Sequence, residues 1–276
     1  MKFFTAGIPL STRGNSTEDG LLRVKELGLD GMELEFVRGV KMREDKARKV
    51  KKLAEENDLS LSVHAPYWIN LNAKEKDKLK ASIERIYESA RVGFLAGARD
   101  ITFHAAYYLG DEPREVHKRV KGILKELVDR LREEKIEVIL RPETTGKPTQ
   151  YGSLEEVLEL SAEIENVMPC IDFAHLHARS GGKFNTVEDF RYVLEKVKGY
   201  LGEKGIKSMH IHMSGIAYSS KGEKHHLNLD ESDLRWREIL EVLYEFGADG
   251  FIVSESPNIE GDAMLMKEYW KKICGS

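Results

Sequence analysis

Residues 59–66 read LSLSVHAP, a short apolar run that ends beside a histidine, and this pattern recurs along the whole chain. An apolar run also leads to His104 in DITFHAA (100–106) and to Glu143 in IEVILRPE (136–143). Runs of about four to eight apolar residues are typical of strands buried on both faces of a parallel sheet. Three further strand-like runs lead in the same way to Asp172, His212 and Glu255.

Longer amphipathic, charged segments separate the apolar runs, so that predicted strands and helices alternate. We predict strands at residues 2–7, 30–36, 59–64, 100–105, 136–142, 166–172, 206–213 and 249–255. We predict helices at residues 16–27, 43–57, 73–96, 112–134, 153–164, 186–204, 231–246 and 260–273. An open sheet would gather its ligands at one switch point, whereas these arise at six strands. The pattern therefore predicts a single (β/α)8 TIM barrel over residues 1–276, with the ligands at the C-terminal face of its strands.

Local signals mark the ends of several predicted helices, and two connections between elements are long. The predicted N-cap residues are Ser16, Ser153 and Thr186, and the predicted C-cap glycines are Gly28, Gly97 and Gly247. The long loops are Ala174–Asn185 and Ser214–Asp230, which are rich in Gly, Ser, Lys and His. Long ordered loops on the active face of a barrel are usually functional.

Composition limits the class of protein. The chain has 276 residues, of which 41% are hydrophobic, enough for a full core. Only Cys170 and Cys274 are present, so a disulfide framework is not expected. The first residues turn polar too quickly for a signal peptide, and no apolar run reaches the roughly 20 residues of a membrane span. We expect a monomer in the cytoplasm, without a membrane. The net charge of −4 neither indicates nor excludes a nucleic-acid partner.

The predicted strand ends carry imidazole and carboxylate side chains without cysteine. This mixture suits zinc, manganese or iron and argues against a structural zinc–sulfur site. Without a cation, carboxylates gathered in a partly dry cavity would cost several kcal/mol per unpaired ion. A structural zinc site can instead contribute on the order of 10 kcal/mol. The sequence therefore predicts a metal-dependent enzyme.

The same segments resemble a known family. In chain order they read SVHAPYWINL, FHAAY, RPETTGK, DFAHLHA, HIHMSG, KHHLNL and SESP. Together they are similar to the endonuclease IV family of apurinic/apyrimidinic endonucleases. The resemblance implies a barrel with three zinc ions, with manganese possible at some positions. It also implies cleavage of double-stranded DNA on the 5′ side of abasic sites, a step of base excision repair that leaves a 3′-hydroxyl.

The resemblance also implies the metal ligands. The first zinc would bind His64 and His104, Glu143 would bridge the first and second, and Asp172, His212 and Glu255 would complete the second. The third zinc would bind His175 with an acid and a histidine from KGEKHHLNL. The family places Asp two residues before that histidine, which favours His225, whereas the aliphatic residue downstream favours His226. We assign Glu223 and His226, because the longer carboxylate can compensate for a histidine displaced by one position.

Other residues have secondary roles in this interpretation. Glu143 would also position the attacking hydroxide for in-line attack on phosphorus. Tyr67 would face the DNA, and Arg38 would contact a phosphate. The segment VRGVKMR after the second predicted strand departs from the family's loop, which puts DNA contacts from that loop in question. Among the remaining histidines, His210 is expected to hydrogen-bond to a ligand and His117 to lie on the surface. His177 is expected to be a loop residue or a hydrogen-bonding neighbour of the site rather than a ligand.

Two alternatives stay open. GLDGMELEF also resembles the xylose-isomerase-like sugar isomerases and epimerases, which use one or two metal ions for proton or hydride transfer. Its Glu33 and Glu35 are predicted to face the barrel interior. The other alternative is an inert barrel that binds damaged DNA or a partner protein.

Overall fold

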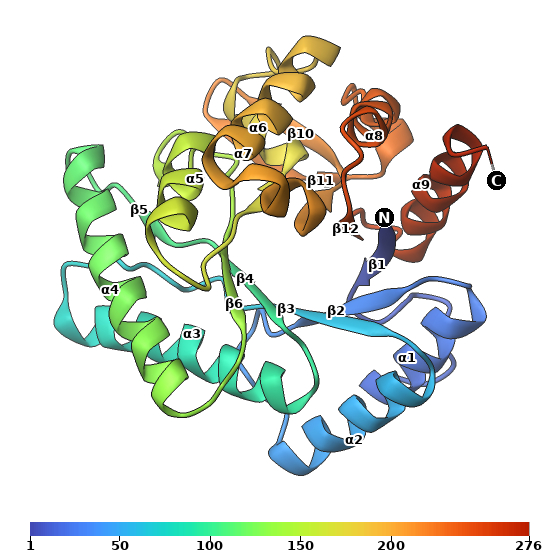
Figure 1. The fold of residues 1–276 in the computed structure, drawn as a ribbon, viewed down its shortest axis with the longest axis horizontal. Helices are drawn as coiled ribbons and strands as arrows, with labels where there is room; N and C mark the ends of the chain where they lie inside the picture. The colour runs from blue at the N-terminus through green and yellow to red at the C-terminus, as the bar shows by residue number, and fades with distance from the viewer. Residues whose placement is uncertain (276) are drawn as a thin grey trace. The chain divides into compact units, whose positions relative to one another are not determined.

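The computed structural model describes residues 1–275 (Figure 1). Eight parallel strands form one sheet in the order β6-β4-β3-β2-β1-β12-β9-β8. Helices alternate with these strands along the chain, so the predicted (β/α)8 TIM barrel is confirmed. The chain divides into two compact units, with the boundary inside β2 (Gly31–Glu35). The expectation that residues 1–276 act as one domain stays a prediction.

The first unit holds residues 1–32, 146–148 and the chain from Cys170 onward. Its sheet strands are β1 (Lys2–Ala6), β8 (Cys170–Asp172), β9 (Met209–Met213) and β12 (Gly250–Ser254). Its helices are α1 (Thr17–Glu26), α6 (Phe173–Arg179), α7 (Val187–Lys207), η1 (Leu229–Glu231), α8 (Trp236–Glu245) and α9 (Glu260–Ile273). A separate hairpin joins β10 (Gly215–Ser219) to β11 (Gly222–Leu227). In Figure 1, α9 lies beside β1 and β12, on which it packs.

The second unit holds residues 33–145 and 149–169. Its sheet strands are β3 (Ser60–His64), β4 (Asp100–Phe103) and β6 (Ile139–Pro142), and β5 (Ala106–Tyr107) pairs separately with β7 (Gln150–Tyr151). Its helices are α2 (Glu44–Glu56), α3 (Lys76–Leu95), α4 (Pro113–Glu133) and α5 (Leu154–Glu163). Figure 1 shows α3 and α4 side by side, and α3 packs on β3 and β4.

The predicted helix ends are confirmed in detail. Ser16, Ser153 and Thr186 each form a capping box, in which the hydroxyl accepts from the backbone of the third helical residue. The three predicted C-cap glycines have positive φ, a backbone conformation that glycine adopts without a steric penalty. Local chemistry therefore sets where these helices begin and end.

The predicted strand at 166–172 is divided. Val167 forms an isolated parallel bridge with Leu140, and the regular strand β8 begins only at Cys170. Pro169 lies between them and has no backbone N–H to donate to a neighbouring strand, which explains the interruption.

Both predicted long loops contain regular structure, so their description as loops was wrong. Helix α6 begins one residue after Asp172, whose carboxylate accepts a 2.7 Å hydrogen bond from the His175 N–H and caps the helix. The second segment folds into the β10–β11 hairpin and η1. A hairpin fixes side chains in register, which an irregular loop does not.

The surface position predicted for His117 was also wrong. His117 is buried in α4, and its Nδ1 lies 2.8 Å from the hydroxyl of Tyr151. The charged neighbours suggested solvent, but α4 packs against β7, and His117 faces that contact. Glu33 is fully buried, as predicted, and accepts a 2.6 Å hydrogen bond from the Ser62 hydroxyl.

No helix within residues 1–275 has the length and apolar character needed to cross a membrane.

Candidate metal centre

In the second unit, His64, His104 and Glu143 form one cluster at the carboxyl ends of β3, β4 and β6. His64 Nε2 lies 3.6 Å from Glu143 Oε2, and His104 Nε2 lies 3.3 Å from Glu143 Oε1. Two ligands bound tetrahedrally to one zinc at about 2.1 Å stand roughly 3.4 Å apart. The spacing of these atoms therefore fits ligands of a shared cation.

The backbone holds this cluster in place. Parallel pairing of β3 with β4, and of β4 with β6, fixes the positions of the strand ends. The Glu143 N–H donates to the Phe103 carbonyl at 3.1 Å. His64 Nδ1 lies 2.7 Å from the Ala65 carbonyl, which can only accept, so Nδ1 carries the proton. The Nε2 lone pair then points at Glu143 and is available to a metal.

In the first unit, Asp172, His212 and Glu255 form a second cluster at strand ends. Asp172 lies opposite His212 in the β8–β9 ladder, and His212 lies opposite Val253 in β12. The Glu255 N–H donates to the carbonyl of Met213. His212 Nδ1 stands 3.4 Å from Glu255 Oε1, again the separation of two ligands on one ion.

A third cluster joins His175 of α6 to Glu223 and His226 of β11. His175 Nε2 lies 3.6 Å from Glu223 Oε2. In a regular strand Glu223 and His226 would point to opposite faces. The hairpin register pairs Tyr218 with Glu223 but Ala217 with His225, so Lys224 is an extra residue. This β-bulge turns Glu223 and His226 to the same face.

The structure thus distinguishes the two adjacent histidines. His226 joins the third cluster, and its Nδ1 donates to the Glu255 carbonyl at 3.0 Å, which leaves Nε2 as the metal-facing nitrogen. His225 is exposed and belongs to none of the candidate clusters found within residues 1–275.

Gly146 is a part of the third cluster that sequence reasoning missed. Its carbonyl accepts from the Glu223 N–H at 2.9 Å. A Cβ at this position would stand 2.7 Å from Glu223 Cβ and 2.9 Å from His175 Cδ2. Only glycine allows the hairpin this close, and the motif RPETTGK was the only sequence signal for it.

Three side chains outside the cluster tie the hairpin to α6, and we call them the hairpin latch: His177, Tyr218 and Asp233. Tyr218 donates to Asp233 Oδ2 at 2.6 Å, and His177 Nε2 lies 2.9 Å from Asp233 Oδ1. His177 Nδ1 lies 2.9 Å from the Phe184 carbonyl, so both ring nitrogens are engaged and neither is available to a metal. Burial alone would raise the pKa of Asp233, but the hydrogen bonds from Tyr218 and His177 hold it below its ordinary value.

His210 lies where its strand alternation predicts, facing the interior beside His212. Both side chains are fully buried, and their Nε2 atoms are 3.2 Å apart. The expected contact between His210 and a candidate ligand is therefore confirmed.

The two residues predicted to contact DNA are accessible. The Tyr67 side chain is 56% exposed, and its ring meets the His64 ring edge to face at 5.7 Å. Arg38 is exposed in the segment after β2. Both follow strand ends in the second unit, as His64 does.

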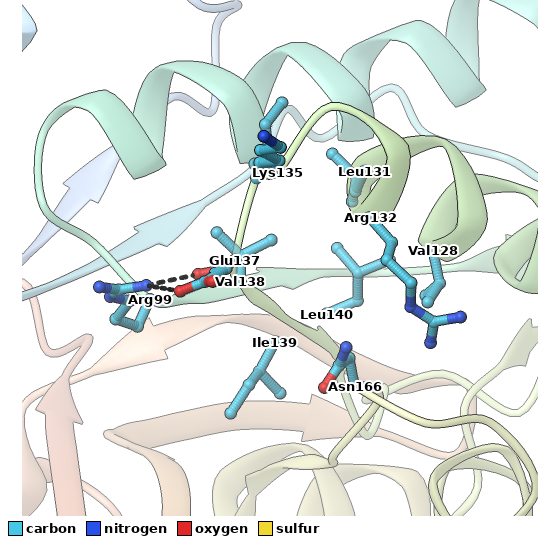
Figure 2. Close-up of a pocket in the computed structure, with 11 residues that line it drawn as sticks. Arg99, Val128, Leu131, Arg132, Lys135, Glu137, Val138, Ile139, Leu140 and Asn166 are labelled. Carbon is cyan, nitrogen blue, oxygen red and sulfur yellow. Dashed lines mark hydrogen bonds and ion pairs between the residues drawn. The ribbon is translucent and has the colours of Figure 1, made fainter.

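A cavity of about 550 Å³ in the second unit lies at the amino end of β6, the opposite end from Glu143. Figure 2 shows Arg99 and Glu137 paired at this cavity, and the Arg99 guanidinium donates to the Glu137 backbone carbonyl at 2.9 Å. Val128, Leu131 and Leu140 are among its apolar lining residues. None of its lining residues belongs to a candidate metal cluster, so we do not regard it as the active site.

Comparison with known sequences gives both a family and more specific relatives. The model of the family described as xylose isomerase-like TIM barrel matches residues 21–273. A protein of Methanocaldococcus jannaschii, described as uncharacterized, is 44% identical over 98% of this chain and 97% of its own length. A probable endonuclease 4 of Geobacillus sp. is 28% identical over 59% of this chain and 54% of its own length. The matched region thus spans about half of that endonuclease.

Solved structures share the fold. A D-tagatose 3-epimerase-like protein superposes with a TM-score of 0.76 at 21% identity, covering 100% of this chain and 97% of its own. Endonuclease IV from Thermus thermophilus superposes with a TM-score of 0.74 at 19% identity, covering 97% of this chain and 99% of its own. At these identities the similarity establishes the fold alone.

Proposed function

Because the chain belongs to the xylose isomerase-like TIM barrel family and carries three histidine–carboxylate clusters, we propose that it is a zinc-dependent endonuclease acting on abasic sites in DNA. It would hydrolyse the phosphodiester 5′ to the lesion and leave a 3′-hydroxyl. The observation that carries the proposal is the third cluster, His175, Glu223 and His226. An additional cation at the hairpin suits a substrate with several charged oxygens to be neutralised.

The strand-end residues receive these roles in the proposal. His64, His104 and Glu143 would hold one ion, and Asp172, His212 and Glu255 would hold another. The tautomer of His64, fixed by the Ala65 carbonyl, presents Nε2 without rotation of the ring. Fixed donors lower the cost of reorganisation when the ion and the substrate bind.

Bound zinc would lower the pKa of a coordinated water towards about 7 and neutralise the phosphate oxygens. Glu143 would orient the attacking water in line with the scissile bond and accept its proton. Because Glu143 is fully buried at the end of β6, its carboxylate has one well-defined direction from which to act.

Contacts with DNA are assigned to two exposed side chains. Tyr67 would support the opened abasic site, because its exposed ring contacts that of His64. Arg38 would bind a phosphate, since its guanidinium is exposed and always charged. Affinity for an abasic duplex should then decrease as salt rises, because each phosphate contact releases counterions.

A sugar isomerase or epimerase is the second candidate function. The fold permits this activity as well as the first, because the D-tagatose 3-epimerase-like protein and endonuclease IV both superpose on nearly the whole chain. Buried Glu33 at the second strand also suits chemistry on a small polar substrate. Such an enzyme would depend on one cluster and would leave the hairpin cluster without a catalytic task.

The deciding experiment uses a duplex with a single tetrahydrofuran site, incubated with the zinc-loaded protein. We expect one nick on the 5′ side of the lesion, a 3′-hydroxyl product and no β-elimination product. The undamaged duplex of the same sequence is the control. Interconversion of ketose and aldose sugars, without nicking of the lesion duplex, would transfer the assignment to the isomerase.

A further inference from the structure

The interior of the first unit contains a second layer of side chains with donor atoms. This layer lies two residues before Asp172 in β8 and two residues before His212 in β9. Cys170 lies opposite His210 in the β8–β9 ladder, as Asp172 lies opposite His212. Because side chains alternate along a strand, Cys170 and Asp172 share a face, and so do His210 and His212. Cys170, His210 and His212 are all fully buried.

The donor atoms of this layer converge. One atom each from Cys170, His210 and His212 lies within 4.8 Å of the others. The 3.2 Å between the two Nε2 atoms is close to the roughly 3.4 Å expected for two ligands of one tetrahedral ion. The same distance also suits an N–H···N hydrogen bond, so the thiol is the feature that separates the two interpretations.

We propose that Cys170, His210 and His212 bind a thiophilic metal ion, separate from the ions of the carboxyl-end clusters. Thiolate and imidazole donors select zinc, cobalt(II) or copper(I) over magnesium, calcium or manganese. His212 would bind this ion through Nε2 while Nδ1 faces Glu255, 3.4 Å away, so its ring would link the two layers. His212 also belongs to the proposed second ion, so the link between the two layers rests on the proposed function, whereas the sulfur ligand Cys170 has no part in it.

The charge balance of the site is consistent with a buried divalent ion. Binding releases one proton from the Cys170 thiol to solvent. With the strand-end ion held at His212 Nδ1, the His212 Nε2 proton is released as well, and the two ions share the resulting imidazolate. The thiolate neutralises one positive charge of the ion, and His210 binds as a neutral ring. A buried thiolate is costly unless a cation accompanies it. The closed position also means that the ion enters before β8 and β9 are fully packed, so it should exchange slowly.

Cobalt(II) gives a direct test, because a thiolate bound to cobalt produces a charge-transfer absorption that nitrogen and oxygen ligands do not. The protein is produced in medium where cobalt replaces zinc, and its near-ultraviolet spectrum is recorded. We expect the wild-type chain to show this band with the intensity of one cobalt-bound thiolate per chain. Cys170→Ser should abolish the band and lower the metal content by one ion per chain. Cys274→Ser is the matched control, since Cys274 is the only other cysteine, and it should change neither.

X-ray absorption of the wild-type cobalt protein provides a second readout that needs no variant. A sulfur neighbour at cobalt is expected. Its absence, or a charge-transfer band that persists in Cys170→Ser, would overturn the proposal and leave His210 as a hydrogen-bonding partner of His212. Cleavage of the lesion duplex is measured separately. A cobalt–sulfur signal without nicking would therefore support this site while contradicting the endonuclease.

Discussion

The strand-end clusters and the hairpin cluster use the same side chains but are held in different ways. Four strand-end donors, His64, Glu143, Asp172 and His212, have side chains at most 4% exposed, while Glu255 is 12% and His104 is 21% exposed. In the hairpin cluster, His175 on α6 is 3% exposed, and the two hairpin residues Glu223 and His226 are 18% and 26% exposed. The sheet positions the first group through backbone hydrogen bonds, whereas a bulge, a glycine and the hairpin latch position the second.

This difference predicts a graded sensitivity to mutation. Donors on sheet strands keep their positions when a neighbouring side chain changes, because the strand ladder is unaffected. Donors on a two-stranded hairpin depend on a few side-chain contacts, and such hairpins are marginally stable alone. The hairpin ion should therefore be held most weakly and lost first to a chelator.

The largest effect is expected from Glu143→Gln, which keeps the size of the side chain but removes the charge proposed to hold a cation with His64 and His104. Cleavage of the lesion duplex should fall by about 10³-fold with the fold retained, because metal-ion catalysis supplies several kcal/mol. Single-turnover rates and circular dichroism measure the two effects. Glu137→Gln, at the exposed amino end of the same strand region, is the control and should leave the rate unchanged. A wild-type rate in Glu143→Gln would remove this residue from the site.

Comparing His226→Ala with His225→Ala tests which of the two adjacent histidines is a ligand in the hairpin cluster. His226→Ala should lower the metal content by one ion and cleavage by about 10²-fold, since one ligand to a stabilising ion is lost. His225→Ala should stay within about twofold of wild type, because that side chain is exposed. Metal analysis after brief exposure to chelator is the measurement. The reverse order of the two variants would mean that the bulge at Lys224 does not set the active register.

A smaller effect is expected from Gly146→Ala, because the added methyl group would press on Glu223 and His175. The hairpin would have to move away from this methyl group, and the affinity of the hairpin ion should fall about tenfold while the strand-end ions remain. Gly199→Ala is the matched control, since a Cβ there meets nothing within 4 Å. Equal retention of metal by both variants would show that the hairpin tolerates displacement.

The smallest effect concerns the hairpin latch and depends on pH. The folded-state pKa of Asp233 is lowered, so its stabilisation is complete above the ordinary aspartate pKa of about 3.9 and is lost as pH falls through the lower folded value. Amide exchange in β10–β11 of the metal-free protein should therefore increase in strongly acidic solution. In Asp233→Asn, exchange should be a few-fold faster at neutral pH and should lose this acid dependence. Identical profiles in the two proteins would show that the latch does not restrain the hairpin.

Most of the barrel follows from sequence patterns alone. Each apolar run predicted a strand of the main sheet. Short apolar runs that alternate with amphipathic helices are typical of strands covered on both faces, and few other folds accommodate them. Ser153 and Thr186 predicted helix starts because a capping box is a local arrangement of four residues. The strand-end positions of His64 and Asp172 follow from the same patterns, since the end of an apolar run is visible in the sequence.

For the hairpin cluster, the family resemblance indicated the donors His175, Glu223 and His226, but no local pattern predicted the hairpin that joins them. Its residues lie in a segment rich in Gly, Lys and His, without the alternating hydrophobicity that marks a strand. The sequence spacing left His225 and His226 both open, and the bulge that turns His226 towards His175 depends on pairing with β10. The buried position of His117 was missed for the same reason: it depends on a contact with Tyr151, which belongs to another element.

By itself, the sequence determined the eight strands of the main sheet and their order along the chain, several helix ends and the donor types at the carboxyl ends, because each depends on residues close together in the chain. Only the tertiary structure decided which donors meet: the register that sets Cys170 beside His210, the bulge that selects His226 and the latch through Asp233. Those contacts join residues far apart in sequence, and their energies depend on burial and on distances that no local pattern records.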